Sequence, residues 1–180
     1  MALREVVHYG DPILRKACNP VKDFDNLSPL IEDMFDTMYE ENGIGLAANQ
    51  IGVDLNLFII DISGIEEEED RAYIFINSEM VDSRGESWFE EGCLSIPDVR
   101  LEVKRPEFIQ IKYQDETGAA HIEEMEGLMA RAIQHEIDHL KGVFIVDRVT
   151  KTVKMTVEKD LKRIFPKKTW SKLHLQIIYW

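Results

Sequence analysis

The sequence predicts an α+β protein, a fold class in which helices and β-sheets come from separate stretches of one chain. Runs rich in β-forming residues lie together in the middle of the sequence, and segments with helical spacing of apolar residues stand on both sides of them. One of the helical segments is apolar on nearly all sides, so we expect it to be largely buried. A length of 180 residues is enough for one domain with a sizeable core.

The first helix is expected to begin at Ser28-Pro29, because a capping residue there precedes a proline at the first helical position. Apolar residues then recur at helical spacing, and Asn42-Gly43 should end the helix. Three strand-like runs follow, with glycines between them: 55–62, 72–77 and 108–113. The acidic run at 66–70 is expected to be a solvated loop between two strands.

The second helix is expected over about 124–141, with Gly142 as its stop. His135 and His139 share one stripe of this helix, and we expect Asp138, on another side, to face solvent or to form a salt bridge. The polar residues occupy one narrow sector: Arg131, Gln134, Asp138 and Lys141. Because the helix is largely buried, its two histidines enter the interior, where a polar group without a role is expensive.

A third, amphipathic helix is expected over about 151–165, and Pro166 should end it. The catalytic domain is therefore predicted to span residues 1–165. The remaining tail, 166–180, has alternating apolar residues from Trp170 onward, which predicts a terminal strand.

The composition excludes several classes of function. The 21 Lys and Arg residues against 34 Asp and Glu leave a net charge of −13, which disfavours binding to DNA or to anionic membranes. Two cysteines, Cys18 and Cys93, cannot form a disulfide framework, and we find no signal-peptide pattern and no run of about 18 apolar residues. We expect a cytoplasmic protein.

The stretch His135-Glu136-Ile137-Asp138-His139 has the HExxH pattern on a predicted helix. A spacing of four residues places both imidazoles on one face, close enough to bind one metal ion. Glu136 lies beside them, where it can move the protons of a metal-bound water. Catalytic sites of this kind have three protein ligands, so a third ligand must come from elsewhere in the chain.

Two other metalloenzyme patterns fit the sequence poorly. One requires a histidine three residues beyond Gly142, where this chain has Ile145, and another would take Glu158 from a basic helix on the surface. Cys93, in the sequence Glu-Gly-Cys-Leu-Ser, is the better candidate, because a thiolate next to a glycine can approach a metal ion without steric trouble.

A glycine-rich run at residues 43–50, GIGLAANQ, is the third motif. It lacks the Lys-Ser or Lys-Thr ending of a phosphate-binding loop. Its small residues let the backbone approach a ligand closely, and Gln50 offers an amide donor suited to a developing oxyanion.

In this order, the sequences GIGLAANQ, EGCLS and QHEIDH resemble the signature motifs of peptide deformylases, and the resemblance covers about residues 5–150. It implies antiparallel β-sheets packed around a central metal-binding helix, with an N-terminal helix and a C-terminal helix plus tail. It also implies removal of the formyl group from the N-terminal methionine of nascent proteins in bacteria or organelles. The usual metal of such enzymes is Fe²⁺, and Zn²⁺ or Ni²⁺ can substitute.

The resemblance implies a role for each matching residue. Glu136 would act as general base and acid while metal-bound hydroxide attacks the formyl carbon, and Gln50 with the Leu94 backbone N–H would stabilise the oxyanion. It also suggests a supporting Glu91–Arg105 pair near the metal, whereas the two residues taken alone fit a surface ion pair nearly as well. The implied metal ligands are Cys93, His135 and His139. The resemblance also implies that Ile44, Phe89, Leu128 and Ala132 line the methionine pocket. Gly45, Gly92 and Arg100 are further candidate substrate-binding residues, and Arg100 fits a solvated arginine at the rim of the site equally.

Two other classes of function stay open from the residues alone. One is a zinc endopeptidase of the HExxH type with Glu158 as third ligand. The other is a non-catalytic module in which Cys93, His135 and His139 hold a structural metal ion. A structural site normally has a fourth protein ligand, and none stands out in the sequence.

Charge is unevenly distributed along the chain. Residues 23–91 hold 19 acidic and 2 basic side chains, whereas residues 148–172 hold 9 basic and 2 acidic ones, a local charge of +7. Such a basic segment on an acidic protein could dock on ribosomal RNA and orient the site toward formyl-methionyl nascent peptides. Solvation of an amphipathic helix packed on the core explains the same pattern.

Overall fold

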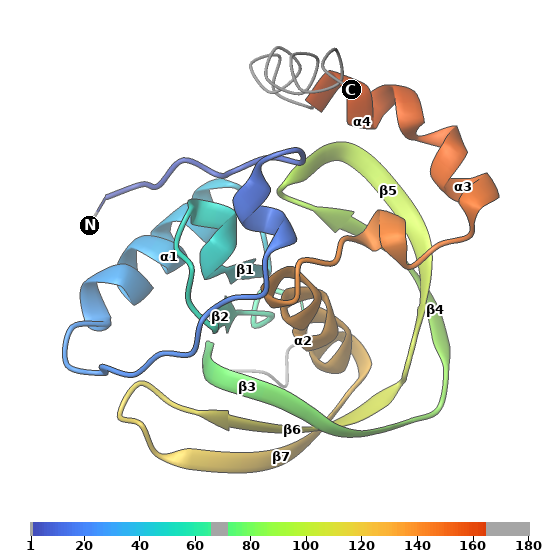
Figure 1. The fold of residues 1–180 in the computed structure, drawn as a ribbon. Coiled ribbons are helices and arrows are strands. Elements are labelled where there is room, and N and C mark those ends of the chain that lie inside the picture. Colours follow the sequence, from blue (N-terminus) through green and yellow to red (C-terminus); the bar gives the residue numbers. More distant parts are fainter. Residues whose placement is uncertain (1, 66–71, 165–180) are drawn as a thin grey trace, which may run out of the picture.

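The structure is a computed structural model that describes residues 2–65 and 72–164. Helix α2 (Gly127–Leu140) is its central element, and strands and other helices surround it (Figure 1). The described strands form two antiparallel sheets: five strands in the order β1-β2-β3-β6-β7, and the pair β4-β5. The predicted α+β fold class is confirmed.

Chain order runs from a helical N-terminal part through the strands to α2 and the C-terminal helices. The strands are β1 (Gly45–Ala47), β2 (Leu57–Ile60), β3 (Tyr73–Arg84), β4 (Ser87–Cys93), β5 (Ile96–Arg105), β6 (Phe108–Gln114) and β7 (Ala120–Glu126). The other helices are η1 (Pro12–Arg15), α1 (Ser28–Glu40), η2 (Ala48–Ile51), η3 (Ile145–Asp147), α3 (Lys151–Thr156) and α4 (Glu158–Ile164), where η marks a 3-10 helix.

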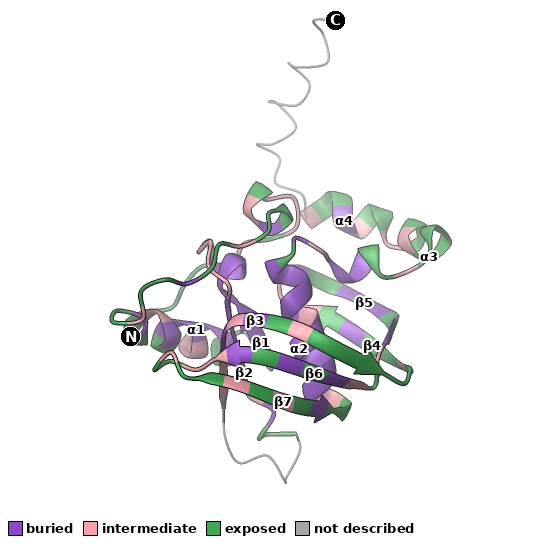
Figure 2. Ribbon diagram, turned by 60° about the horizontal axis from the view of Figure 1, so that its bottom comes forward, coloured by how far each residue is buried: buried purple, intermediate pink, exposed green. Residues whose placement is uncertain are grey.

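Three groups of buried apolar side chains hold these elements together. The first fills the space between α2 and the five-stranded sheet and includes Phe58, Phe75 and Ile133. The second packs α1 on β1 and β2, and the third joins β5 to η3 and α4. As predicted, α2 is buried along most of its length (Figure 2). The sequence thus places two histidines on a rigid element inside the protein.

Helix α1 begins at Ser28, as expected, whereas its cap residue and the start of α2 differ from the prediction. Leu27, not Ser28, holds the cap position of α1, and its carbonyl oxygen accepts the Ile31 N–H at 2.9 Å without help from a capping side chain. Leu27 is buried, so packing fixes this helix start. Helix α2 begins at Gly127 because residues 120–126 pair with β6 as strand β7.

The C-terminal helix and the sheet also differ in detail from the prediction. The helix expected over 151–165 is divided at Val157 into α3 and α4, where the Thr156 hydroxyl donates to the Val153 carbonyl at 2.7 Å. Strands β1, β4, β5 and β7 lie outside the three strand-like runs of the sequence, and β3 extends beyond the expected 72–77. The acidic run at 66–70, the predicted domain end at 165 and the tail 166–180 lie outside the described residues.

Within the described ranges, every helix is too short or too polar to span a lipid bilayer.

Candidate metal centre

Three potential ligand atoms meet where the end of β4 faces α2. The Sγ of Cys93 lies 3.2 Å from Nε2 of His139, which is itself 3.2 Å from Nε2 of His135. Among the described residues, this is the one group of three such side chains whose ligand atoms all lie within 4.8 Å of one another. Such a group of one thiolate and two imidazoles would suit zinc or iron.

The ring of His135 is oriented by a buried carboxylate. Oε2 of Glu91 lies 3.1 Å from Nδ1 of His135, and Glu91 also accepts hydrogen bonds from Arg105 at 2.7 and 2.9 Å and from Arg131 at 2.6 Å. Burial opposes the charge of Glu91, yet the hydrogen bonds from His135 and Arg105 outweigh it and lower the Glu91 pKa to about 2. An ionised Glu91 favours a proton on Nδ1, which leaves Nε2 free for a metal ion. The Glu91–Arg105 pair is confirmed.

His139 is oriented differently. Its Nδ1 is buried and has no hydrogen-bond partner among the described residues. The side-chain amide of Asn49 donates to the His139 carbonyl oxygen at 2.6 Å, and the Phe144 ring packs edge-on against the imidazole with centroids 5.9 Å apart. Backbone anchoring and packing therefore hold this side chain.

Glu136 projects into the site beside a glycine backbone. A Cβ atom on Gly45 would lie 2.6 Å from Oε1 of Glu136, so a larger residue at position 45 would collide with the carboxyl group. Oε2 of Glu136 is buried without a hydrogen-bond partner in the described part of the chain. Burial raises the Glu136 pKa to about 7, although His135 and Arg105 oppose the rise. Such a carboxyl group can both accept and donate a proton near neutral pH.

The amide of Gln50 is fixed in one orientation. Its oxygen accepts the Ala47 N–H at 2.8 Å, and its nitrogen donates to Oγ of Ser95 at 3.3 Å and lies 4.0 Å from Sγ of Cys93. The carbonyl side is thus occupied by the glycine-rich run, and the N–H side faces the metal centre. This orientation is the one that an oxyanion donor needs.

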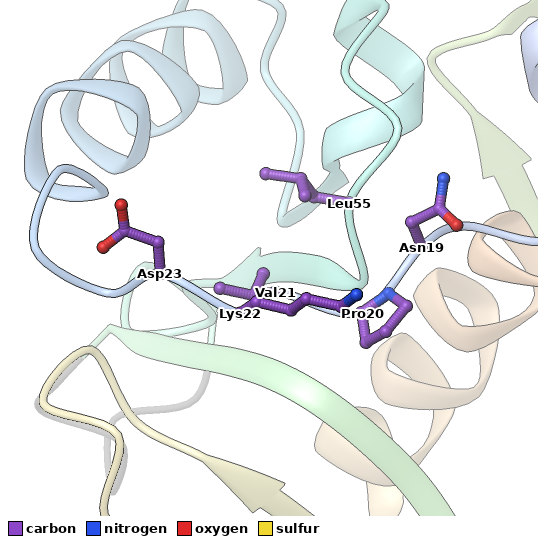
Figure 3. A pocket seen from close by; sticks show the side chains of 6 residues that line it. All are labelled: Asn19, Pro20, Val21, Lys22, Asp23 and Leu55. Carbon is purple, nitrogen blue, oxygen red and sulfur yellow. The ribbon is translucent and has the colours of Figure 1, made fainter.

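A groove of about 690 Å³ opens over this centre. All predicted site residues except His139 line it: Ile44, Gly45, Gln50, Phe89, Gly92, Cys93, Leu94, Arg100, Leu128, Ala132, His135 and Glu136. His139 is 1% exposed and lies behind them. A second hollow of about 490 Å³, between residues 19–23 and Leu55, holds no group of metal-ligating side chains (Figure 3). The groove is therefore the candidate site.

Comparisons with known proteins agree with this geometry. A family model described as polypeptide deformylase matches residues 3–155. The chain belongs to the peptide deformylase family. It is 41% identical to a peptide deformylase of Flavobacterium psychrophilum over 186 residues, an alignment that covers 96% of each chain. It is 46% identical to that of Chlorobaculum parvum over 158 residues, which covers 87% of this chain and 84% of the relative.

Solved deformylase structures share the fold. The crystal structure of a peptide deformylase from Legionella pneumophila is 40% identical, with a TM-score of 0.83 and coverage of 97% of this chain and 98% of that one. The enzyme from Thermus thermophilus is 39% identical, with a TM-score of 0.85 and coverage of 91% and 98%. Membership of this family makes the chain a hydrolase, and peptide deformylases depend on a metal ion.

The structure brings two residues to the candidate site that the sequence motifs do not assign. Arg131 is buried, donates to Glu91, and also bonds the Ser87 carbonyl oxygen at 2.9 Å, so it ties α2 to β4. Ser95 holds the Gln50 amide. Arg131 stands one helical turn before His135 on a helix predicted to be buried, and that position is the signal that could have revealed it.

The structure also shows where the alternative ligand Glu158 lies and whether Asp138, in the polar sector of α2, faces solvent. Glu158 lies on α4, where its side chain is 56% exposed and pairs with Lys162 at 2.8 Å, outside the group of close ligand atoms. Asp138 is buried, which corrects the expectation that it could face solvent, and it forms salt bridges with Arg105 and Arg148. Strand β5 and the segment after η3 bring these arginines to this side of the helix.

Proposed function

We propose that the chain removes the formyl group from the N-terminal formyl-methionine of newly made proteins, and releases formate and a free amine. The observation that carries the proposal is that three ligand atoms, a buried carboxyl group and an oriented amide face one groove. Family membership gives the reaction class, and the groove supplies the chemical groups that this reaction requires.

Cys93, His135 and His139 are the proposed metal ligands, with Fe²⁺ as the native ion and Zn²⁺ or Ni²⁺ as substitutes. Three protein ligands leave a coordination position open, which is typical of catalytic rather than structural sites. A divalent ion bound there would lower the pKa of water toward neutrality and polarise the formyl oxygen. This arrangement argues against a purely structural metal.

Glu136 is the proposed proton carrier. Its Oε2 has no hydrogen-bond partner among the described residues, so it is available to accept a proton from the attacking water. The same carboxylic acid can then donate that proton to the nitrogen of the departing amine, which would otherwise be a poor leaving group. One proton thus moves from water to amine through a single side chain.

Gln50 Nε2 and the Leu94 backbone N–H are the proposed donors to the oxyanion. Gln50 is 1% exposed and its amide is held at both ends, so little reorganisation accompanies the reaction. Leu94 lies in the two-residue turn between β4 and β5, directly after the proposed ligand Cys93.

The methionine side chain is proposed to enter the apolar part of the groove formed by Ile44, Phe89, Leu128 and Ala132. Gly45 and Gly92 would let the peptide backbone approach closely, and Arg100, exposed beside Gly92, would contact the peptide farther along. The single catalytic domain over 1–165, with 166–180 as a tail, remains part of the proposal.

Cytoplasmic placement and ribosome docking through the basic 148–172 segment are proposed as well, supported by two free cysteines and by the charge distribution. Replacing three exposed lysines by glutamine in the full chain tests docking: Lys151, Lys159 and Lys162. A matched control replaces Lys16, Lys22 and Lys112. Ribosome cosedimentation at low salt should fall in the first variant alone, and equal cosedimentation of both would contradict docking.

The test of function is hydrolysis of formyl-Met-Ala-Ser by Fe²⁺-loaded enzyme, with acetyl-Met-Ala-Ser and a longer unformylated peptide as controls. We expect formate release from the first peptide alone. Cys93→Ser should bind metal poorly and lose activity, whereas Cys18→Ser should keep both. Internal cleavage of the unformylated peptide would instead support an endopeptidase.

A further inference from the structure

Asp138 lies between two arginines from different parts of the chain. Its Oδ2 accepts hydrogen bonds from Nη1 of Arg105 at 2.8 Å and from Nε of Arg148 at 2.9 Å, and Nη2 of Arg148 contacts the other oxygen. Arg105 ends β5, whereas Arg148 follows η3 and stands just before α3. The carboxylate therefore connects the helix of the metal centre to the segment that enters the C-terminal helices.

Arg105 divides its donors between two carboxylates. Its Nε and Nη2 donate to Glu91 at 2.7 and 2.9 Å, whereas its Nη1 donates to Asp138. Glu91 in turn lies 3.1 Å from Nδ1 of His135. A continuous set of contacts thus runs from Arg148 through Asp138, Arg105 and Glu91 to His135.

Burial makes the position of Arg105 sensitive to the charges around it. The side chains of Glu91, Arg105 and Asp138 are only 4–5% exposed, so a charge without its partner is expensive here. Arg131 gives Glu91 a second cation at 2.6 Å, and Arg148 gives Asp138 its second cation. Without Arg148, Asp138 would draw Arg105 toward itself and away from Glu91.

We propose that Arg148 is a positioning residue for His135, acting through Asp138, Arg105 and Glu91, and that the entry into α3 is thereby connected to the metal centre. The inference rests on the proposed function in one respect, namely that His135 is a metal ligand. Arg148 is 45% exposed and is not among the described residues that line the groove, so its effect must pass through this network.

The test measures the affinity of the metal-free full chain for Zn²⁺ by competition with a chelator. We compare the wild type with Arg148→Met, Arg148→Lys and Arg84→Met. Arg84 is the matched control, because it is 58% exposed and pairs through both terminal nitrogens with Glu124. Loss of a partner that directly orients a ligand weakens metal binding about 10- to 100-fold. Arg148 lies three contacts beyond such a partner, Glu91, so we expect a smaller loss of about 3- to 10-fold for Arg148→Met. Arg148→Lys should recover part of this loss, and Arg84→Met should stay within about twofold.

A double-mutant cycle separates positioning from a general structural effect. In a Glu91→Gln background the network is already broken, so Arg148→Met should change Zn²⁺ affinity less than about twofold. The visible spectrum of the Co²⁺ form gives a second readout, which Arg148→Met should shift and Arg84→Met should not. Should Arg148→Met fail to fold, Arg148→Gln takes its place under the same criteria.

Two results would overturn the inference: unchanged Zn²⁺ affinity in folded Arg148→Met, or the same loss in both backgrounds. Either would leave the proposed function intact, since the wild type would still bind metal and deformylate its peptide. Absence of Zn²⁺ binding by the wild type would contradict the proposed function and the inference together.

Discussion

The two histidines of α2 lie one helical turn apart, and their surroundings differ. His135 faces the ionised Glu91, which two arginines hold at 2.6 to 2.9 Å. His139 has no partner for its Nδ1 among the described residues and rests on Phe144 and on the Asn49 bond to its carbonyl oxygen. One histidine is thus positioned by charge, and the other by packing.

The different surroundings of His135 and His139 indicate where a substitution should weaken metal binding most. Removing one member of a buried ion network leaves other charges unpaired, a loss of about 3 to 5 kcal/mol. Removing one neutral hydrogen bond leaves a polar group unsatisfied, a loss of about 1 to 3 kcal/mol. Substitutions on the His135 side should therefore disturb metal binding more than comparable ones on the His139 side.

The largest expected effect concerns Glu136, which stands between the two sides and is not a proposed ligand. Glu136→Gln should lower turnover of formyl-Met-Ala-Ser by about 10²- to 10⁴-fold, because the amide cannot accept the proton. Metal content, measured by atomic emission, should stay at one ion per chain. Loss of the ion would show that Glu136 supports the ligands, and the contrast between the two histidines would need revision.

Gln50 should have the next largest effect. Gln50→Ala removes a fixed donor from a water-poor site and should lower kcat by about 10²- to 10³-fold, or about 2.7 to 4 kcal/mol. Zn²⁺ affinity should hardly change, since the amide only approaches Cys93. Gln110→Ala, on the exposed face of β6, is the control. A loss below twofold would remove Gln50 from the oxyanion role.

Glu91→Gln and Asn49→Ala test whether His135 depends on charge more than His139 depends on packing. The first should weaken Zn²⁺ binding by about 10- to 100-fold, because the ring of His135 loses its charged acceptor. The second should weaken it clearly less, since Asn49 bonds the backbone of His139 and not its ring. Chelator competition measures the Zn²⁺ affinity of both variants and thus the ratio of the two losses. Equal losses would mean that charge and packing position the ligands equally well.

The smallest effect concerns Asp147, whose carboxylate accepts the Phe144 N–H at 3.0 Å on the His139 side. Partial burial opposes its charge, but hydrogen bonds from Arg15 and Lys154 outweigh it and lower the Asp147 pKa to about 2. The unfolded value is about 3.9, so this contribution to stability is complete above that pH and is lost as the pH falls toward 2.

Urea unfolding of the metal-free enzyme measures the pH-dependent contribution of Asp147 to stability directly. The free-energy difference between wild type and Asp147→Asn should shrink from pH 6 to pH 3, whereas Asp25→Asn, at an exposed position, should show no such trend. A difference that grows in acid would have the wrong sign for a lowered pKa.

Short-range patterns in the sequence predicted the centre of the site well. HExxH on a buried helix places two imidazoles together because helical spacing is local, and the structure brings Cys93 and Gln50 to them as expected. The supporting charges depend on long-range packing. Asp138 could be predicted to pair or to face solvent, but only the cover provided by β5 and Arg148 decides between the two.

The sequence of β5 contains a pattern from which the buried position of Arg105 could have been predicted. Leu101, Val103 and Arg105 alternate along the same buried face, so the third of them should have been expected inside, with an acidic partner. Lys104 and Arg105 are both charged, however, so the alternation of apolar and polar residues stops at Val103 in the sequence. The register that pairs Glu91 with Leu101 and brings β4 beside β5 is set by tertiary pairing, which a single sequence does not display.

The most direct test of the account is the absorption spectrum of the Co²⁺-substituted enzyme. A bound thiolate produces an intense near-ultraviolet charge-transfer band. We predict this band at one Co²⁺ per chain in the wild type and in Cys18→Ser, and its loss in Cys93→Ser. Retention of the band in Cys93→Ser, or its loss in Cys18→Ser, would contradict the proposed metal centre.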